Sequence, residues 1–586
     1  MNAVFRRLPL ILTVTALGAC QALTGGTRPA LSLPTYTLLA FAALLTWRVK
    51  GPRSHGAECL IATGVLFSYL LARAVFSPLP SLARADVFLM LGGLLVYWLT
   101  ATVFVTARQR MAVVFTLLVL GGIHTLVGVV QAAQGEEFML FGFVRAAVGS
   151  RASGLLISPN HLAGFLEIAG VMALSVAWWS GRKPAVKIFA GYAALCCYLG
   201  LLLSQSRGGV LSAVFSLLVW TGLTLRASYL GKPHRFDRAL ILGVGAVAVL
   251  FCIGGLVIAT HTELRERLAT AFGRDIRVAN WQAALDQFRQ APVFGTGAGT
   301  HFYLGRFFRR PELQADPVHA HNDYLELLAE YGLIGAAGMA VFLALHAARG
   351  LRALREAAHA LRATEEAGND ELALTVGALA AFAAMAAHSA LDFNMHIPGN
   401  ALVMAFIFGI LAHPELVAED ALQTTVVPTV RGVRLAAGGL LLVLALLAWP
   451  GAFFTEGARV ALRVGEYPDA ITSGTRAVRL DPWNPFACFY LGEAHRLQAE
   501  LEPVYADRQA HREASARAFG QGLRLFPQDE NLLARRGQVL DRLRRFDEAE
   551  ASFQAALAAD PQLEILRELY EKHRALRAPA PSEPEQ

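Results

Sequence analysis

The sequence predicts an all-α protein in which a polytopic bundle of about 13 transmembrane helices is followed by a domain of helical repeats. The chain has 586 residues, of which 55% are hydrophobic and only 17% are charged, whereas a water-soluble protein carries about 25% charged residues. Thirteen apolar runs are close to the length of about 20 residues that a helix needs to cross a bilayer. After residue 455 the composition becomes charged and amphipathic, which indicates helices in water.

The predicted spans follow one another along residues 1–454. The first run begins after Arg6 and Arg7 and contains Cys20, as a lipoprotein signal would. We interpret it as a membrane helix because many more spans follow, and cleavage at Cys20 is the alternative. The thirteen runs lie near residues 8–25, 33–48, 57–77, 86–107, 111–132, 161–180, 186–204, 208–225, 239–260, 331–347, 372–391, 399–413 and 434–454.

Basic residues are distributed unequally between the two sides of the predicted bundle. The loops on the side of the N-terminus contain 20 Lys and Arg residues, and the short loops on the other side contain five, namely Arg28, Arg84, Arg145, Arg151 and Arg207. Because Lys and Arg accumulate in cytoplasmic loops, we expect a cytoplasmic N-terminus, and the odd number of spans places the C-terminus outside. The net charge of +7 follows from this distribution. It predicts contact with membrane lipids and no nucleic-acid partner.

Every segment that suggests chemistry falls on the predicted outer side of the membrane. These segments are residues 151–160, 206–209, 261–330 and 392–398. A purely structural interpretation gives no reason for all of them to share one side. We therefore expect the functional site there, with the long loop 261–330 as its main contributor.

The predicted C-terminal domain, residues 455–577, contains signs of tetratricopeptide repeats. The pairs Asp481-Pro482, Phe526-Pro527 and Asp560-Pro561 each end a predicted helix, and the last two pairs are 34 residues apart. That spacing is the period of the tetratricopeptide repeat, and residues 547–557 resemble the second helix of such a repeat. Stacked helical repeats build concave binding surfaces, so this domain is predicted to bind a protein partner.

The last residues of the chain, 578–586, are rich in Pro and Glu. Such a composition cannot bury enough apolar surface to fold. We expect a disordered tail there, which completes a division of the chain into 1–454, 455–577 and 578–586.

Arg207 follows an apolar run and is the first candidate for binding a charged substrate. An arginine at the edge of a bilayer is costly unless it is paired or reaches the headgroups. Gly208 and Gly209 follow it, and glycines let a phosphate approach the backbone closely. The alternative is a boundary arginine that contacts lipid headgroups.

Arg277 is the second candidate, one helical turn ahead of Trp281. A guanidinium group is well shaped for bidentate contacts with a diphosphate. A solvated surface arginine is the alternative. The glycine run at residues 295–299 does not follow a strand, so we interpret it as a tight loop and not as a dinucleotide site.

His319 and His321 precede the predicted span 331–347 and allow three interpretations. A zinc site is one, although no third ligand is evident in the sequence. Helix capping or hydrogen bonding by the His321-Asn322 pair is another. The third is a general base or an orienting group for an acceptor hydroxyl, because histidine titrates near neutral pH.

A turn that ends at Pro398 carries three further polar residues. All three could line the same cavity as the other segments or cap the helices on either side, and we interpret Asn394 and His396 as caps. Asp392 is different, because a carboxylate at the edge of a membrane usually has a partner. We expect Asp392 to have a partner.

Six segments occur in a characteristic order along the chain. They are Ser158–Ala163 (SPNHLA), Leu203–Gly209 (LSQSRGG), Arg277 with Trp281, Pro292–Gly297 (PVFGTG), His319–Leu325 (HAHNDYL) and His388–Phe393 (HSALDF). Together they resemble the O-antigen ligase/polymerase family of bacterial membrane glycosyltransferases over roughly residues 110–415. The C-terminal repeats resemble one subgroup of that family.

The resemblance implies transfer of a glycan from undecaprenyl diphosphate at the periplasmic face of the bacterial inner membrane. The acceptor implied is a lipid A core or a growing glycan. A protein O-oligosaccharyltransferase of the same family is one alternative. A flippase or transporter for the same lipid is the rival from another class, and a membrane-anchored scaffold is the third.

The resemblance also implies roles for particular residues. Arg207 and Arg277 would bind the diphosphate, and His321 would lie beside the acceptor, although the presence of His319 leaves the assignment between the two histidines open. The implied catalytic residues are His321, His319 and Arg277. The implied substrate-binding residues are Arg207, Ser206, Arg151, Asn160, Asn322, Tyr324 and Asp392.

We expect the transfer to need no metal and no other cofactor. The outer loop holds no Asp-x-Asp pair that would bind a divalent cation, and fixed arginines can stabilise a diphosphate leaving group instead. Attack by a hydroxyl on the side opposite the diphosphate would invert the configuration of the sugar.

Overall fold

The computed structural model describes residues 3–48, 57–134, 151–238, 276–364, 368–417 and 428–577, except residues 315 and 317, together with a few positions between 239 and 248. This part of the chain forms helices joined by turns and loops and contains no β-strand. The predicted all-α class is therefore confirmed.

Ten helices in the described residues are long and apolar enough to cross a membrane. They are α2 (Pro29–Leu44), which a short 3-10 helix extends, α3 (Ala57–Val75), α4 (Pro80–Thr102), α5 (Ala107–Gln134), α6 (Pro159–Trp179), α7 (Pro184–Leu203), α8 (Arg207–Gly231), α13 (Asp323–Arg362), α14 (Asp370–His388) and α16 (Pro428–Val464). Two further helices have shorter apolar parts, namely Arg7–Ala22 within α1 (Ala3–Ala22) and the whole of α15 (Pro398–Ala412), and they complete the correspondence with twelve of the predicted spans. The remaining predicted span, 239–260, lies almost entirely outside the described residues, as does the loop before residue 276.

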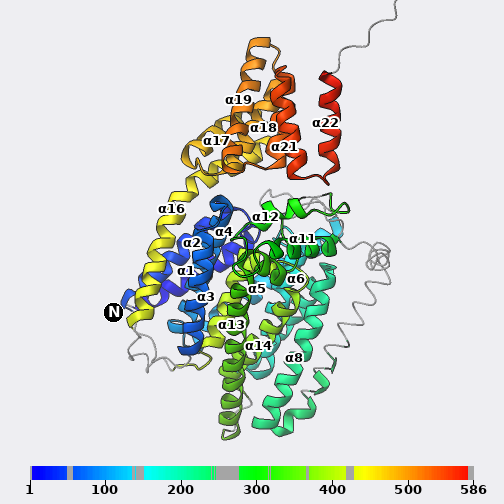
Figure 1. The fold of residues 1–586 in the computed structure, drawn as a ribbon. Helices are drawn as coiled ribbons and strands as arrows, with labels where there is room; N and C mark the ends of the chain where they lie inside the picture. Colours follow the sequence, from blue (N-terminus) through cyan, green and yellow to red (C-terminus); the bar gives the residue numbers. More distant parts are fainter. Residues whose placement is uncertain are drawn as a thin grey trace, which may run out of the picture.

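The segments singled out in the sequence meet at one end of the bundle, where the C-terminal helices lie (Figure 1). We call this the capped end; it comprises residues 23–28, 76–79, 151–158, 204–206, 291–322 and 389–397. Backbone hydrogen bonds join these segments, for example from Ala152 N to Leu203 O at 3.0 Å and from Asp323 N to Ser389 O at 2.8 Å. The sequence-based expectation that they share one end is confirmed for the described residues.

Helix α13 bends at Gly332, and the bend fixes the direction of its first turns. The backbone of Gly332 has φ 66° and ψ −168°, a conformation that is essentially restricted to glycine. The preceding loop fills the break, because Leu333 N donates to Pro292 O at 2.9 Å and Gly297 N donates to Glu330 O at 2.9 Å. The glycine run is therefore a tight loop, as predicted, and it holds the start of α13 in place.

The C-terminal part consists of six helices that stand above the bundle in Figure 1. They are α17 (Tyr467–Leu480), α18 (Pro485–Leu501), α19 (Tyr505–Leu525), α20 (Glu530–Arg542), α21 (Phe546–Ala559) and α22 (Glu564–Arg577). Asp481, Phe526 and Asp560 are the C-caps that directly follow α17, α19 and α21, so the three predicted helix ends are confirmed. That these helices are tetratricopeptide repeats stays a prediction.

The predicted domain boundary at residues 454/455 does not coincide with a break in the backbone. Helix α16 continues from the bundle to Val464, and its polar end is tied to the bundle by an ion pair between Arg28 and Glu456 at 2.7 Å. Arg84 forms a second such pair with Asp481 at 2.7 Å. The C-terminal helices are thus attached to the capped end at several points.

A mixed apolar and ionic contact joins the C-terminal helices to the segment that follows α12 (His301–Leu304). The rings of Tyr303 and Phe526 lie 5.6 Å apart. Arg306 contacts Asp529 at 2.8 Å and Glu530 at 2.6 Å. Burial raises the pKa of Glu530 to about 7, although the Arg306 guanidinium lowers it and the Asp529 carboxylate raises it further.

This pKa predicts how stability depends on pH. A carboxyl group whose pKa is raised by folding stabilises the folded state below its unfolded pKa, and this contribution is lost as the pH rises through the folded value of about 7. We expect Glu530→Gln, which keeps the uncharged form, to nearly match wild type at pH 5 and to unfold roughly 2–4 °C higher at pH 8. Thermal unfolding in detergent measures this. Glu568→Gln, at an exposed position of α22, is the control, and an equal shift at both pH values would contradict the assignment.

Candidate active site

Asp392 brings together residues from three separate segments at the capped end. Its side chain is 1% exposed, and Oδ1 lies 3.3 Å from Nδ1 of His321. Oδ2 lies 3.7 Å from Nη2 of Arg277, which belongs to the first turn of α11 (Ile276–Gln290). Asp392, which was expected to have a partner, thus lies beside an arginine and a histidine that were both candidates for the site.

The environment keeps Asp392 ionised. Burial raises its pKa, but the contact with His321 and the nearby His161 and His388 lower the pKa below its usual value. A charged carboxylate therefore faces His321 on one side and the Arg277 guanidinium on the other. Such a carboxylate orients an imidazole ring and favours the proton on the nitrogen that faces it.

The backbone of His321 is also constrained. Its φ is 53°, which few residues other than glycine adopt. Nε1 of Trp281 donates to His321 O at 3.3 Å, so α11 supports this loop as well as supplying Arg277. Arg277 and Trp281 lie one turn apart on the same face of α11, so both contact the same site, Arg277 at Asp392 and Trp281 at His321.

Three histidines surround the ring of Phe393, which follows Asp392. His319 stacks on it with ring centroids 4.3 Å apart. His321 and His161 approach it edge-on at 4.8 and 4.9 Å. Phe393 therefore forms an apolar floor between the histidines, which limits the directions in which their nitrogens can point.

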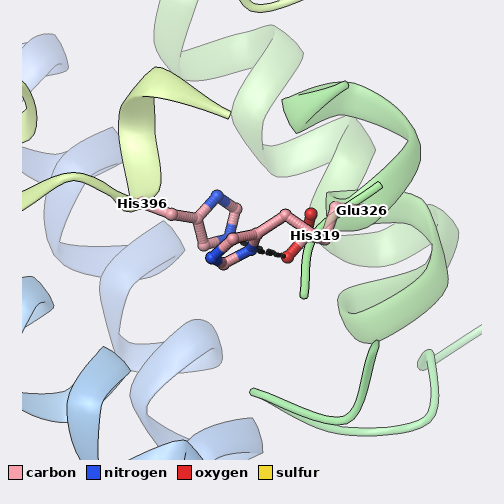
Figure 2. Close-up of side chains that lie close together, drawn as sticks. All are labelled: His319, Glu326 and His396. Atoms are coloured by element: carbon pink, nitrogen blue, oxygen red, sulfur yellow. Dashed lines mark hydrogen bonds and ion pairs between the residues drawn. The ribbon is translucent and has the colours of Figure 1, made fainter. Parts of the chain in front are cut away.

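His319 belongs to a second carboxylate–histidine group, shown in Figure 2. Its Nδ1 lies 2.7 Å from Oε1 of Glu326, and Nε2 of His396 lies 3.4 Å from the same oxygen. Nδ1 of His396 lies 3.0 Å from Asp323. Burial lowers the pKa of His396, but the carboxylates of Glu326 and Asp323 raise it well above its usual value. The expectation that His396 is only a helix cap is therefore too simple.

The same three side chains form the only group in the described part of the chain that is suited to a metal ion. Ligand atoms of His319, Glu326 and His396 lie within 4.8 Å of one another, and two imidazoles with one carboxylate are a common zinc donor set. No third ligand is evident in the sequence because Glu326 and His396 approach His319 only in the folded protein. In the structure, both histidines are hydrogen-bonded to carboxylates, His319 to Glu326 and His396 to Asp323.

Arg207 and Ser206 lie at the start of α8. Ser206 is buried and caps the helix by accepting a hydrogen bond from Gly209 N at 3.2 Å. Arg207 is exposed. The first turn of α8 packs against the end of α14, where a Cβ at Gly208 would lie 3.4 Å from Nε2 of His388. Ser206 thus has a structural role, while Arg207 stands beside the segment that carries Asp392.

The remaining predicted substrate-binding residues have protein partners. Arg151 donates to Asn160 Oδ1 and to Ser204 O, both at 3.0 Å. Asn322 caps α13 by accepting from Tyr324 N at 3.0 Å, and its Nδ2 donates to Ala390 O at 2.9 Å. The capping interpretation of Asn322 is confirmed, and its amide is used within the protein. The hydroxyl of Tyr324 donates to Ala386 O at 2.7 Å.

A cavity of about 230 Å³ lies beside the site, between α3, α4, α13, α14 and α15. Its lining is mostly apolar, as at Phe342 and Phe408, but one end carries Asp86, Glu330 and His396. The lining includes neither Arg277 nor Arg207, so the cavity is distinct from the side of the site that carries Arg277. Sequence reasoning missed Asp86, although an acid within an apolar run was a usable signal.

A further buried group links three spans below the site. Nδ1 of His388 lies 3.0 Å from Glu167, and both side chains are fully buried. The hydroxyl of Ser212 donates to the other oxygen of Glu167. Neither Glu167 nor Ser212 was a sequence candidate. This group holds α6, α8 and α14 together directly beneath Asp392.

Residues 192–340 match the O-antigen ligase family. The matched region runs from α7 to the bend of α13 and beyond, and it contains Arg207, Arg277, His319 and His321. Asp392 and His396 lie outside it. The match supports a membrane enzyme of the ligase or glycosyltransferase type. No curated protein matches the chain.

Proposed function

We propose that this protein transfers a glycan from undecaprenyl diphosphate to an acceptor hydroxyl at the periplasmic face of the bacterial inner membrane, as an O-antigen ligase does. The observation that carries the proposal is the meeting of His321, Arg277 and Asp392 at the capped end. The match to the O-antigen ligase family over residues 192–340 supports it. A lipid A core or a growing glycan is the proposed acceptor.

Arg277 and Arg207 are proposed to bind the diphosphate of the donor. Cleavage of the bond between sugar and diphosphate places negative charge on the leaving oxygen, and fixed guanidinium groups stabilise that charge without a metal. Arg277 is 21% exposed and Arg207 is exposed, so both can reach a ligand at the capped end.

His321 is the proposed general base. Asp392 faces its Nδ1 at 3.3 Å, which favours the proton on that nitrogen and leaves Nε2 to accept a proton. The acceptor oxygen forms a bond to the anomeric carbon, its proton moves to Nε2, and the diphosphate leaves with the electron pair of the broken bond. Attack opposite the diphosphate inverts the sugar configuration.

Reconstitution with a lipid-linked glycan tests the function and identifies the acceptor. Purified protein in liposomes is given the donor together with lipid A core, a second lipid-linked glycan or a peptide, and the elongated product is measured. We expect elongation of the lipid A core or of the glycan, with an unchanged rate after treatment with EDTA. Elongation of the peptide alone would indicate the oligosaccharyltransferase. Passage of the donor across the bilayer without transfer would indicate a flippase and overturn the proposal.

The proposal requires the capped end to face the periplasm. The charge asymmetry of 20 to five basic residues predicts this orientation. We expect an alkaline phosphatase fused at residue 470 to be active and one fused at residue 360 to be inactive. The reverse pattern would place the site in the cytoplasm and remove the basis for an undecaprenyl diphosphate donor presented outside.

A further inference from the structure

The loop that leads to His319 is held by buried ion pairs with the C-terminal helices. Arg309 is 0% exposed, and its Nε lies 2.6 Å from Oδ2 of Asp560, which is also 0% exposed. The other nitrogens of Arg309 donate to Leu313 O at 3.0 Å and to Asp316 Oδ1 at 3.1 Å. One guanidinium thus ties the loop to itself and to the end of α21.

Arg306 forms a second buried attachment. Its side chain is 4% exposed, and Nη1 lies between Asp529 and Glu530 at the start of α20. Nη2 lies 3.7 Å from Asp316, and the guanidinium covers the ring of Phe302 at 4.7 Å. The loop therefore has both charge and apolar contacts with the C-terminal helices.

Asp316 connects these attachments to the site. Both arginines contact it, and Nδ2 of Asn531 in α20 lies 3.3 Å from its Oδ2. His319 follows three residues later in the sequence. A chain of three residues spans at most about 11 Å, so the position of Asp316 restricts where His319 can lie, and His321 follows two residues after His319.

The fully buried pair of Arg309 and Asp560 makes this attachment sensitive to the loss of one partner. Removal of one member leaves an uncompensated charge away from water, which is far more costly than the loss of an exposed pair. The loop and α20–α21 are therefore expected to move as one unit.

We propose that the C-terminal helices position the loop of residues 303–322, which carries His319 and His321. Arg306 and Arg309 are the positioning residues. This proposal rests on the function proposed above, and it adds a second role to the predicted binding of a partner by the C-terminal domain. A misplacement of about 1 Å at a reacting group can lower a rate by about 10². Loosening the loop should therefore lower the transfer rate even though α20 and α21 contribute no group to the reaction.

Hydrogen exchange and kinetics on the full-length protein test the proposal together. Arg309→Gln and the milder Asp560→Asn are compared with Arg577→Ala, which removes a surface pair within the C-terminal helices. We expect faster exchange confined to residues 303–322, and a kcat lowered by about 10² in Arg309→Gln with the KM for the donor changed less than about twofold, because Arg277 is untouched. Arg309→Lys should recover part of the loss, since a lysine can still pair with Asp560.

The two readouts separate this proposal from the proposed function. Unchanged exchange in residues 303–322 of both variants would overturn the attachment. Faster exchange with unchanged kcat would overturn positioning. If the wild-type protein transfers no glycan, the proposed function fails, while the exchange measurement still decides whether the C-terminal helices hold the loop. Exchange that rises throughout the bundle in Asp560→Asn would assign the pair to global stability and contradict a role confined to the loop.

Discussion

His321→Ala is expected to lower glycan transfer by on the order of 10²–10⁴, the usual cost of removing a positioned general base. The substitution takes away the imidazole that Asp392 holds at 3.3 Å. It should leave folding nearly unchanged, because the His321 side chain is 36% exposed. Initial rates in the reconstituted assay, with thermal unfolding as the check on folding, measure both effects.

The control for this variant is His359→Ala. His359 lies near the far end of α13, the helix that begins two residues after His321, and is exposed, so its loss should leave the rate unchanged. His319→Ala distinguishes the two histidines of the loop. If His319→Ala is inactive and His321→Ala fully active, the role of the base moves to His319 and the assignment of His321 is wrong.

Arg277→Lys is expected to lower transfer by on the order of 10², the scale for loss of one group that stabilises charge in the transition state. Lysine keeps the charge but cannot provide the planar fork that makes bidentate contacts with phosphate oxygens. The guanidinium group of Arg277 has several N–H donors and can contact Asp392 and a diphosphate at the same time. The single ammonium group of a lysine is not expected to contact both.

Arg289→Lys is the matched control, because Arg289 lies on the same helix, is 69% exposed and pairs with Asp286. It should transfer at the wild-type rate. A steady-state comparison at varied donor concentration measures both variants. Wild-type kinetics in Arg277→Lys would show that Arg277 has a structural role only and would contradict diphosphate binding at this position.

The helices could be predicted from the sequence because their cause is local. A run of apolar residues of sufficient length favours a membrane helix whatever surrounds it. The short run at 399–413 also forms a helix, α15, and Leu402 and Phe406 are almost completely buried in it. Its length therefore does not have to match the bilayer, since protein covers it.

The bend of α13 and the end of α16 could not be predicted, because their causes are not local. Gly332 lies at the start of an apparently continuous span, and the bend exists because the loop at residues 292–297 supplies the missing hydrogen-bond partners. Composition changes at residue 455, but α16 continues to Val464. A helix does not have to end where its surroundings change from lipid to water.

The candidate site was only partly predictable. Asp392 was expected to pair because a carboxylate at a membrane edge is costly alone, but its pairing with Arg277 and His321 depends on how α11, α13 and α14 pack. Glu326 carried no local signal and His396 stood out only as a polar residue of its turn, because each becomes a partner of His319 only in the fold. Residue type indicated the chemistry, and tertiary contacts decided the partners.

A double-mutant cycle of His321→Ala and Asp392→Asn tests the central claim most directly. If Asp392 acts by orienting His321, the two losses overlap, and kcat of the double variant falls far less than the product of the single losses. The rates are measured in the reconstituted assay under saturating donor. Losses that multiply fully would show that the two residues act independently and would contradict a shared site.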